Sequence, residues 1–347
     1  MPDYRQSLMY KEAMEAPDAV ARLVHESALA IANVARALQQ NPPTMVITCA
    51  RGSSDHAATF AKYLIETLLG WVTASAAPSV RSVYRADLHI PAGSLFIAIS
   101  QSGASPDLIE SLRYARTKGA HTLAIVNAPD SPLAHAADWT ISLCAGPEIS
   151  VAATKSYITS LAAIAALVHG VQAAATNGPA PSPLLKLPAA LRAAQALDWS
   201  PLADALQYAK NMLVLGRGAG FGVAQEAALK LKETCGIHAE AFSTAELRHG
   251  PMALAATGVP MLIFRPDDAA AAGVDALIAD LVATRSQPFV VGPCPDGARE
   301  LPRIKADPLI APIVQIQSFY LMVARLAFAR GLNPDVPPLL KKVTETT

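Results

Sequence analysis

Short apolar runs alternate along this 347-residue chain with longer stretches whose apolar positions repeat at helical spacing. A short apolar run bounded by turn residues predicts a buried strand, and a longer periodic stretch predicts a helix. Strands are expected at 45–49, 94–99, 121–126, 139–143, 212–215, 259–265 and 287–293. Helices are expected over 3–40, with a break at Pro17-Asp18, and after the strands that end at 49, 99, 143 and 215. Strands that alternate with helices predict parallel sheets covered by helices, an α/β fold.

The first half of this pattern recurs in the second half. VITCARGSSDHAA at 46–58 aligns with LVLGRGAGFGVAQ at 213–225, and SLFIAIS at 94–100 aligns with VPMLIFR at 259–265. Two copies of one Rossmann-like domain, each a parallel sheet flanked by helices, are the simplest interpretation. The expected divisions are an N-terminal helical segment at 1–40, a first domain at 41–175, a Pro-rich linker at 176–190, a second domain at 191–330 and a tail at 331–347.

Composition narrows the functional classes. The chain is 52% hydrophobic and 16% charged with no net charge, which favours compact folding, and it has no Lys/Arg run that would indicate a nucleic-acid partner. Its four cysteines are far apart and show no zinc-ligand spacing. The N-terminus lacks an apolar signal core, and polar residues interrupt the most apolar helix, at 157–175. A cytoplasmic protein with no membrane partner is therefore expected.

A cluster of polar side chains surrounds the turn after the strand at 94–99. Its members are Ser100, Gln101, Ser102 and Ser105. Hydroxyls and the free N–H groups of a helix start suit a phosphate monoester, and Ser53 follows the neighbouring strand. The turn lacks the GxGxxG pattern of dinucleotide sites. The plainer alternative is a polar turn in which Ser105 caps a helix that starts at Pro106.

Acidic, basic and imidazole side chains gather further along the chain. Glu226, Lys230 and Glu233 are spaced for one face of a helix, and His249 follows shortly afterwards. A glutamate can move a proton between adjacent carbons of a sugar, and an imidazole can shuttle a ring hydroxyl proton. The alternatives are a solvated salt-bridged stripe on the helix and a structural role for His249. Lys341, in a proline-braced tail, is either a solvated lysine or an amine placed for a Schiff base.

Taken together, these motifs resemble the sugar isomerase (SIS) family, and most closely the isomerase half of glucosamine-6-phosphate synthase. The matching motifs, in chain order, are MYKEAMEAPDAV, ARGSS, SQSGASPD, GPEISVAATKS, LGRG, EAALKLKE, IHAEAF, AELRHGP and LKKVT. The resemblance runs from about Met9 to Thr344. It implies two tandem SIS domains, each a Rossmann-like parallel sheet between helices.

The resemblance also implies roles for individual residues. The substrate-binding set would be Ser53, Ser100, Gln101, Ser102, Ser105, Val151 and Ala153. Glu233 would be the acid and base for proton transfer between C1 and C2, with Lys230 beside it. His249 would open the sugar ring, and in this family it can reach in from the partner subunit, while Lys341 matches a lysine that forms a Schiff base with the ketose. A homodimer that binds a hexose or hexosamine 6-phosphate, without a metal or redox cofactor, is implied.

The sequence departs from the synthase pattern at three places. Pro2 follows Met1 where the synthase has a glutaminase domain with an N-terminal cysteine, Ala153 replaces a serine, and Ser105 replaces a threonine. Without glutamine as nitrogen donor, the isomerase chemistry run backward converts glucosamine 6-phosphate and water to fructose 6-phosphate and ammonia. The alternatives are an aldose–ketose isomerase, a deaminase for another hexosamine phosphate, and a non-catalytic sugar-phosphate-binding regulatory module.

Overall fold

The computed structural model describes residues 3–176, 182–284 and 286–342. These residues form two compact units, each containing one five-stranded sheet. The first unit comprises Asp18–Glu148 and Lys155–Leu185. The second unit comprises Ile149–Thr154, Lys186–Lys342 and the N-terminal residues through Pro17.

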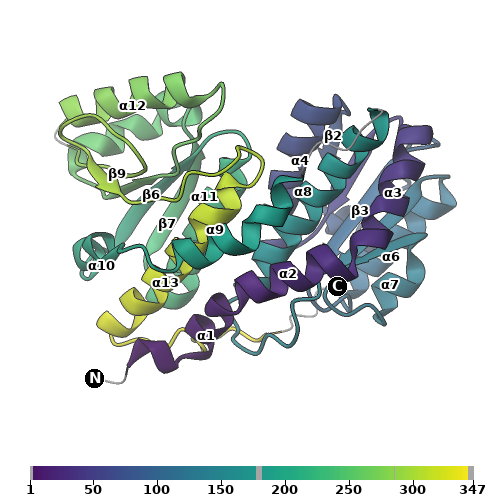
Figure 1. Ribbon diagram of the computed structural model, residues 1–347, viewed down its shortest axis with the longest axis horizontal. Coiled ribbons are helices and arrows are strands. Elements are labelled where there is room, and N and C mark those ends of the chain that lie inside the picture. The colour runs from purple at the N-terminus through teal and green to yellow at the C-terminus, as the bar shows by residue number, and fades with distance from the viewer. Residues whose placement is uncertain (1–2, 177–181, 285, 343–347) are drawn as a thin grey trace. The chain divides into compact units, whose positions relative to one another are not determined.

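The first sheet is parallel throughout, in the order β2-β1-β3-β4-β5, and Figure 1 labels β2 and β3. Its strands are β1 (Val46–Cys49), β2 (Thr73–Ser75), β3 (Leu95–Ser100), β4 (His121–Val126) and β5 (Trp139–Ser142). The accompanying helices are α2 (Ala16–Glu26), α3 (Ala28–Gln40), α4 (Ser53–Leu64), α5 (Pro78–Ser82), α6 (Pro106–Thr117), α7 (Pro132–Ala136) and α8 (Lys155–Ala175), with a π-helical turn, η2, at Ile65–Leu69.

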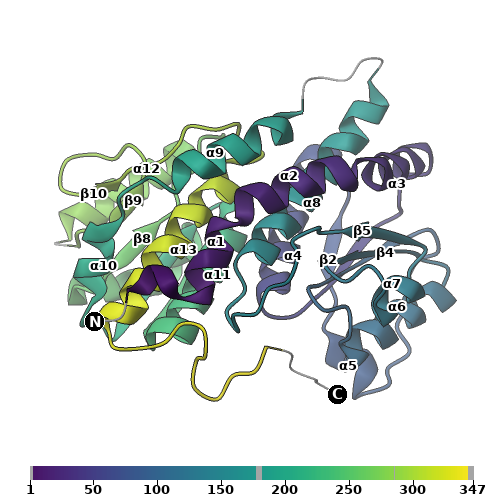
Figure 2. The same ribbon diagram turned by 60° about the horizontal axis from the view of Figure 1, so that its bottom comes forward.

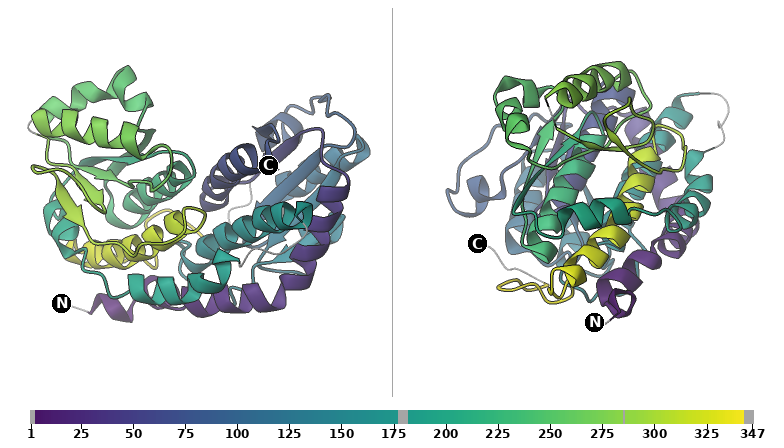
Figure 3. Two further views of the ribbon diagram at one scale, coloured as in Figure 1. Left: turned by 45° about the horizontal axis from the view of Figure 1, so that its top comes forward. Right: turned by 90° about the vertical axis from the view of Figure 1, so that its left-hand side faces the viewer.

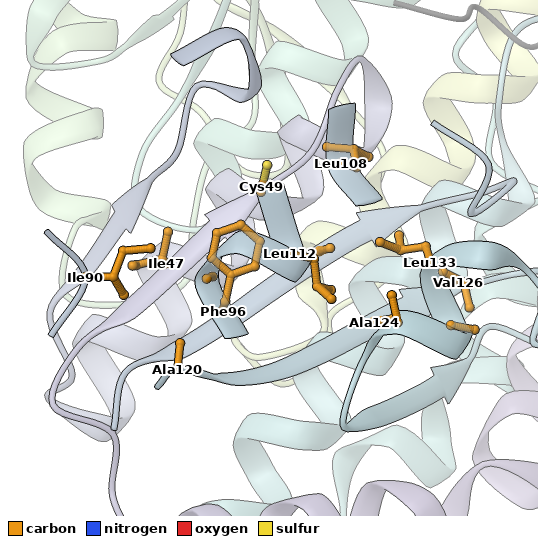
Figure 4. Packing of buried hydrophobic residues seen from close by; sticks show 14 residues of the cluster. Ile47, Cys49, Ile90, Phe96, Leu108, Leu112, Ala120, Ala124, Val126 and Leu133 are labelled. Carbon is orange, nitrogen blue, oxygen red and sulfur yellow. The ribbon is translucent and has the colours of Figure 1, made fainter. Parts of the chain in front are cut away.

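The two faces of the first sheet bury alternate residues of each strand. On β3, Phe96 packs in a cluster with Leu108 and Leu112 of α6 (Figure 4). Leu95 and Ile97 instead line a small apolar space together with residues of α3, α4 and α8. Successive side chains of a strand point to opposite faces, so a strand covered on both sides needs a continuous apolar run.

The second sheet is also parallel, in the order β10-β9-β8-β6-β7. Its strands are β6 (Asn211–Gly216), β7 (His238–Ser243), β8 (Met261–Ile263), β9 (Phe289–Val291) and β10 (Arg299–Leu301). The helical elements of this unit are η1 (Tyr4–Gln6), α1 (Leu8–Met14), η3 (Pro183–Lys186, ending at the unit boundary), α9 (Leu187–Ala194), α10 (Ser200–Leu206), α11 (Gly220–Cys235), η4 (Glu246–His249), η5 (Pro251–Thr257), α12 (Ala271–Ala283) and α13 (Ala311–Ala329).

Helices cover both faces of this sheet as well. Helix α13 packs against α1, α9, α10 and α11 (Figure 2), and α12 lies on the opposite face from α13 (Figure 3, left). Val274 and Ile278 of α12 join Leu213 and Ile263 of the strands in one buried cluster. The second unit therefore repeats the layers of the first.

The duplication predicted from sequence is confirmed by strand order. When the strands of each sheet are numbered from the start of their own copy, both sheets read 2-1-3-4-5. Each of the seven predicted runs contains a strand. β2, β7 and β10 were not predicted, because their residues are short of apolar runs and partly exposed.

Three segments differ from the expected divisions. Part of the predicted linker, residues 177–181, lies outside the described residues, but the remainder from Pro183 forms η3 and then α9, with Leu184 and Leu187 buried. The loop Ile149–Thr154, expected within the first domain, belongs to the compact body of the second unit. The N-terminal helical segment breaks after Met14 and at Ser27. The break predicted at Pro17-Asp18 is wrong, because both residues lie in the first turn of α2, where proline needs no N–H partner.

Two helices, α8 and α13, are long and apolar enough to cross a membrane by length and composition. Within the most apolar window of each, 61% of α8 and 83% of α13 is buried inside the fold. Helices that pack on a sheet in a protein core pass the same test, so these helices are weak evidence for a membrane protein. For α8 the burial agrees with the buried helix expected from sequence.

Candidate functional site

The first sheet changes the direction of its strand order between β1 and β3. In sheets of this order, ligands bind at the carboxyl ends of the two strands that flank this switch point. β1 and β3 are hydrogen-bonded neighbours, with Cys49 opposite Ala98. The chain leaves β1 into Arg51-Gly52 and α4, which starts at Ser53, and it leaves β3 into the serine-rich turn and α6. Ser53 and that turn thus follow adjacent strand ends.

The serine-rich turn, residues 100–105, is shaped by its own backbone contacts. The Ser100 hydroxyl accepts a hydrogen bond from Gly103 N at 3.0 Å, and the Ser102 hydroxyl accepts one from Ala104 N at 3.3 Å. Gly103 has a φ of +62°, which glycine adopts with little strain. Ser105 stands at the N-cap of α6 as predicted, but its side chain makes no capping hydrogen bond. Its hydroxyl is therefore not used to cap the helix.

The arginine of this switch point is already paired. Arg51 Nε donates to Asp107 Oδ2 at 2.6 Å, and the Asp107 side chain is fully buried. The partner oxygen, Oδ1, accepts from Leu108 N at 2.8 Å. Because Asp107 neutralises Arg51, an anion here would be held mainly by hydroxyls and by backbone N–H groups at the helix start.

The acidic and basic residues of α11 form one buried ionic group. Lys230 Nζ donates to Glu233 Oε2 at 2.5 Å and lies 3.4 Å from Glu226 Oε1. The side chains of Glu226 and Lys230 are 0% and 1% exposed, and that of Glu233 is 20% exposed. Tyr320 of α13 donates to Glu226 Oε1 at 3.0 Å. The solvated-stripe interpretation is therefore wrong, because α13 covers this part of the helix.

Glu226, Lys230 and Glu233 differ in how far each side chain is exposed to solvent. A buried lysine is costly unless opposite charges and hydrogen bonds compensate it, and here two carboxylates do so. Glu226 is held by Lys230 and Tyr320 and has no exposure, so it serves as the inner counter-charge. Glu233 is the carboxylate that reaches solvent, with one oxygen oriented by Lys230. The arrangement can present a fixed carboxylate to a substrate carbon.

Val151 and Ala153, which were also predicted to bind substrate, lie in the loop Ile149–Thr154. Val151 N donates to the Asp335 backbone carbonyl at 3.2 Å, and Ser150 O accepts from Lys342 Nζ at 2.7 Å. The C-terminal tail is thus brought against this loop in the second unit. The neighbouring lysine, Lys341, is exposed. Val343 and Thr344 of the LKKVT motif lie outside the described residues.

The structure joins some predicted residues and not others. Lys230 contacts Glu233, and the tail contacts the loop at 149–154. Among the described residues, these two sets of contacts include neither the serine-rich turn nor His249, which is exposed in η4. The described residues hold no group of three or more His, Cys, Asp or Glu side chains suited to a metal ion.

Two residues that contact the predicted site residues or their loop were not predicted from the sequence. Tyr320 is 94 residues from Glu226, and nothing in the apolar pattern of α13 marks it out. Glu12 accepts from the backbone N–H groups of Ile149 and Ser150. It stands in the MYKEAMEAPDAV motif, which gave a signal of resemblance but no role.

Comparison with known proteins identifies the family. The SIS domain family model matches residues 40–170 and 205–291. A glutamine--fructose-6-phosphate aminotransferase [isomerizing] of Thermococcus kodakarensis is 33% identical over 356 residues, which cover 96% of this chain and 57% of that protein. The chain thus spans little more than half of this relative's length.

Two solved structures are similar over nearly the whole chain. A protein from Silicibacter pomeroyi, described as a candidate phosphosugar isomerase, is 41% identical with a TM-score of 0.89, over 95% of this chain and 100% of its own. The C-terminal domain of glucosamine-fructose-6-phosphate aminotransferase from Francisella tularensis is 28% identical with a TM-score of 0.84, over 96% of this chain and 98% of its own. The first matched segment contains every strand of the first sheet, and the second contains β6 to β9 of the second sheet. The chain belongs to the SIS domain family.

Proposed function

We propose that the chain is an amino-sugar phosphate deaminase/isomerase that converts glucosamine 6-phosphate and water to fructose 6-phosphate and ammonia. The observation that carries this proposal is the buried Glu226–Lys230–Glu233 group, in which one carboxylate is oriented and partly exposed. Family membership supports a sugar phosphate as the ligand. The names of the relatives support isomerase chemistry on a hexose 6-phosphate.

The phosphate end of the substrate is assigned to the first switch point. The proposed contacts come from Ser53, Ser100, Gln101, Ser102 and Ser105, with backbone N–H groups at the start of α6. The free hydroxyl of Ser105 at the N-cap supports this assignment. The loop with Val151 and Ala153 is assigned to the sugar itself.

The proposed reaction proceeds in three proton-balanced steps. His249 opens the pyranose by moving the ring hydroxyl proton. Glu233 then takes the proton from C2 of the open-chain amino aldose and returns a proton to C1, while O1 gains a proton and the amine nitrogen loses one, which leaves a hydroxyl at C1 and an imine at C2. Water adds to C2, and ammonia leaves as the C2 carbonyl of fructose 6-phosphate forms.

Two lysines assist in this scheme. Lys230 fixes Glu233 and stabilises negative charge that develops on the open-chain sugar. Lys341 stabilises the same charge from the tail, or forms a Schiff base with the ketose. A homodimer, in which His249 is supplied by the partner subunit, and a cytoplasmic location complete the proposal.

The test is to incubate the protein with individual hexosamine 6-phosphates and to measure ammonia and ketose together. Wild type should release equal amounts of both from glucosamine 6-phosphate. Glu233→Gln should lose about a hundredfold to ten-thousandfold in turnover while still binding substrate, because only proton transfer is removed. Glu240→Gln, an exposed glutamate on the neighbouring strand β7, is the matched control and should keep full activity.

Other outcomes decide between the alternatives. Ketose formed from an aldose phosphate without ammonia would make the chain an aldose–ketose isomerase. Ammonia from another hexosamine phosphate would change the substrate epimer. Binding of sugar phosphates with no turnover, in any combination with water, ammonia or glutamine, would favour a regulatory binding module and contradict the proposal.

A further inference from the structure

The loop 149–154 is hydrogen-bonded to residues near both termini of the chain. One side is held by Glu12 of α1, and the other by the tail residues Asp335 and Lys342. The ends of the loop are also tied together, since Glu148 accepts hydrogen bonds from Ser156 N at 3.1 Å and Ser156 Oγ at 2.5 Å. These contacts restrict the backbone of the loop.

Glu12 makes the most concentrated of these contacts. Its Oε1 accepts from Ile149 N at 2.5 Å, and its two carboxylate oxygens lie 3.3 and 3.2 Å from Ser150 N. Glu12 is only 5% exposed. Hydrogen bonds from successive backbone N–H groups to a buried carboxylate are stronger than those between neutral groups. The side chain thus fixes the backbone directly before Val151.

Asp335 connects α1 to the same loop. Its carboxylate accepts from Leu8 N and Met9 N, both at 2.8 Å, at the start of α1. Its backbone carbonyl accepts from Val151 N at 3.2 Å. Helix α1, the tail and the loop therefore form one hydrogen-bonded cluster within the second unit, the unit that also contains Glu233.

We propose that Glu12 is a positioning residue for substrate binding: it holds the backbone of 149–154 so that the loop presents Val151 and Ala153 to the sugar. Glu12 acts through the loop and does not touch substrate. The role of the loop in sugar binding rests on the proposed function, whereas the ordering of the loop by Glu12 does not.

The experiment compares wild type with Glu12→Ala, Glu12→Gln and the control Glu15→Gln. Glu15 is an exposed carboxylate at the end of the same helix. Hydrogen exchange is measured on peptides that cover 149–154. Glu12→Ala should raise exchange there about tenfold, because two charge-assisted hydrogen bonds are lost, and Glu12→Gln should raise it less, because an acceptor oxygen remains. Peptides from α13 and the Glu15→Gln control should match wild type.

The kinetic readout uses ammonia release from glucosamine 6-phosphate. Glu12→Ala should raise KM about tenfold and change kcat by less than about threefold, with Glu12→Gln intermediate, because substrate positioning is weakened while Glu233 is untouched. A loss of thermal stability with unchanged loop exchange and unchanged KM would overturn the proposal. If Glu12→Ala does not fold, Glu12→Gln carries both measurements.

Failure of the proposed function gives a separate result. If wild type releases no ammonia, exchange in 149–154 is measured with and without glucosamine 6-phosphate. Protection of the loop in wild type but not in the Glu12 variants supports the positioning role without any turnover. Equal exchange in wild type and Glu12→Ala, with or without the sugar phosphate, would contradict it.

Discussion

The two sheets share one strand order but present different chemistry at the same place. In the first, the switch point between β1 and β3 carries the serine-rich turn. In the second, the equivalent point between β6 and β8 carries Arg265-Pro266-Asp267. The same backbone layout thus ends in hydroxyls in one copy and in charged side chains in the other.

The charged side chains of the second switch point satisfy one another. Arg265 donates to both oxygens of Asp275 at 2.6 and 2.7 Å, and Asp267 accepts from Arg303 at 2.7 Å and from Arg265 at 3.3 Å. The guanidinium groups of Arg265 and Arg303, which could have bound an anion, are therefore already paired with carboxylates of the chain. A small pocket adjoins these residues, lined in part by Arg217 and Asp268.

The difference indicates how a duplicated domain divides its work. The turn of the first copy carries hydroxyls, with the Arg51–Asp107 pair beside it. The turn of the second copy carries arginine and aspartate side chains that pair with one another and with Asp275 and Arg303. In the second copy, the helix that follows β6, α11, carries the buried Glu226–Lys230–Glu233 group instead. In the proposed function, one copy binds the phosphate and the other moves the proton.

The largest expected contrast concerns the reactivity of two thiols near strand ends, one in each sheet. Burial raises the pKa of Cys49, at the end of β1, to about 12, whereas Cys294, after β9, is only partly buried. Since the thiolate is the reactive form, Cys49 at pH 8 should be alkylated at least about a thousandfold more slowly than an ordinary thiol. Peptide mass spectrometry measures this, and Cys294 should react much faster.

The pH dependence of labelling sharpens this prediction. A thiol whose pKa is about 12 gains thiolate about tenfold per pH unit throughout the range below that value. The rate for Cys49 should therefore keep rising from pH 7 to 9 in the folded protein. Rapid labelling of Cys49 at pH 7 would show that the end of β1 opens readily.

Two glycines with positive φ, one beside each switch point, give the next largest contrast. At Gly103 in the first switch point, φ is +62° and a Cβ would overlap Ser131 Oγ. At Gly218 in the second, φ is +58° but the nearest atom, Asp268 Oδ2, is 3.9 Å away. Gly103→Ala should lower the free energy of unfolding by about 3 kcal/mol, through strain and overpacking, and Gly218→Ala by about 1 kcal/mol. Equal losses in denaturant titrations would contradict the close approach at Gly103.

Removing the carboxylate of the second switch point should have a moderate effect. Asp267→Ala removes the carboxylate that pairs with Arg303, whose side chain is 12% exposed, and leaves it the Arg265 carbonyl as an acceptor. Stability should fall by about 2 kcal/mol, less than for a fully buried pair because Asp267 is 24% exposed.

Added anion tests the same variant further. Sulfate should restore part of the lost melting temperature in Asp267→Ala by replacing the carboxylate between the two arginines, more than it stabilises wild type. Sugar-phosphate affinity should stay within about twofold of wild type. A large loss of affinity would show that the second switch point also serves the substrate.

The smallest expected effect lies in the serine-rich turn itself. Ser105→Ala removes a hydroxyl that makes no capping bond, so stability should change by less than about 0.5 kcal/mol. Affinity for the sugar phosphate should fall about tenfold, the effect of one hydrogen bond to a charged group. Calorimetry on glucosamine 6-phosphate gives the affinity, and Ser79→Ala on α5 is a control hydroxyl outside the switch point. Unchanged affinity would argue against phosphate binding by this residue.

Much of the fold could be predicted because its signals are local. A strand covered on both faces needs a continuous apolar run wherever it lies, and this marked β1, β3 and β4. β7 escaped prediction because it alternates exposed and buried residues and contains His238 and Glu240. An edge strand of this kind differs little from a loop in sequence.

The candidate site could be predicted only in part, because its signals in the sequence are also local. The spacing of Glu226, Lys230 and Glu233 places them on one face of a helix in any fold, yet it suits a solvated stripe and a buried group equally well. The partner that settles the question, Tyr320, is 94 residues away in sequence. The hydrogen bond from Ile149 N to Glu12 joins residues that are 137 positions apart in sequence.

By itself, the sequence determined the α/β alternation, the duplication and the residue types that stand at the strand ends. Tertiary structure alone decided that Lys230 is buried between two carboxylates, that Asp267 fills the second switch point, and that the loop at 149–154 belongs with the second sheet. The physical reason is that periodicity records which positions of an element are apolar. Burial and hydrogen-bond partners depend instead on which distant elements meet.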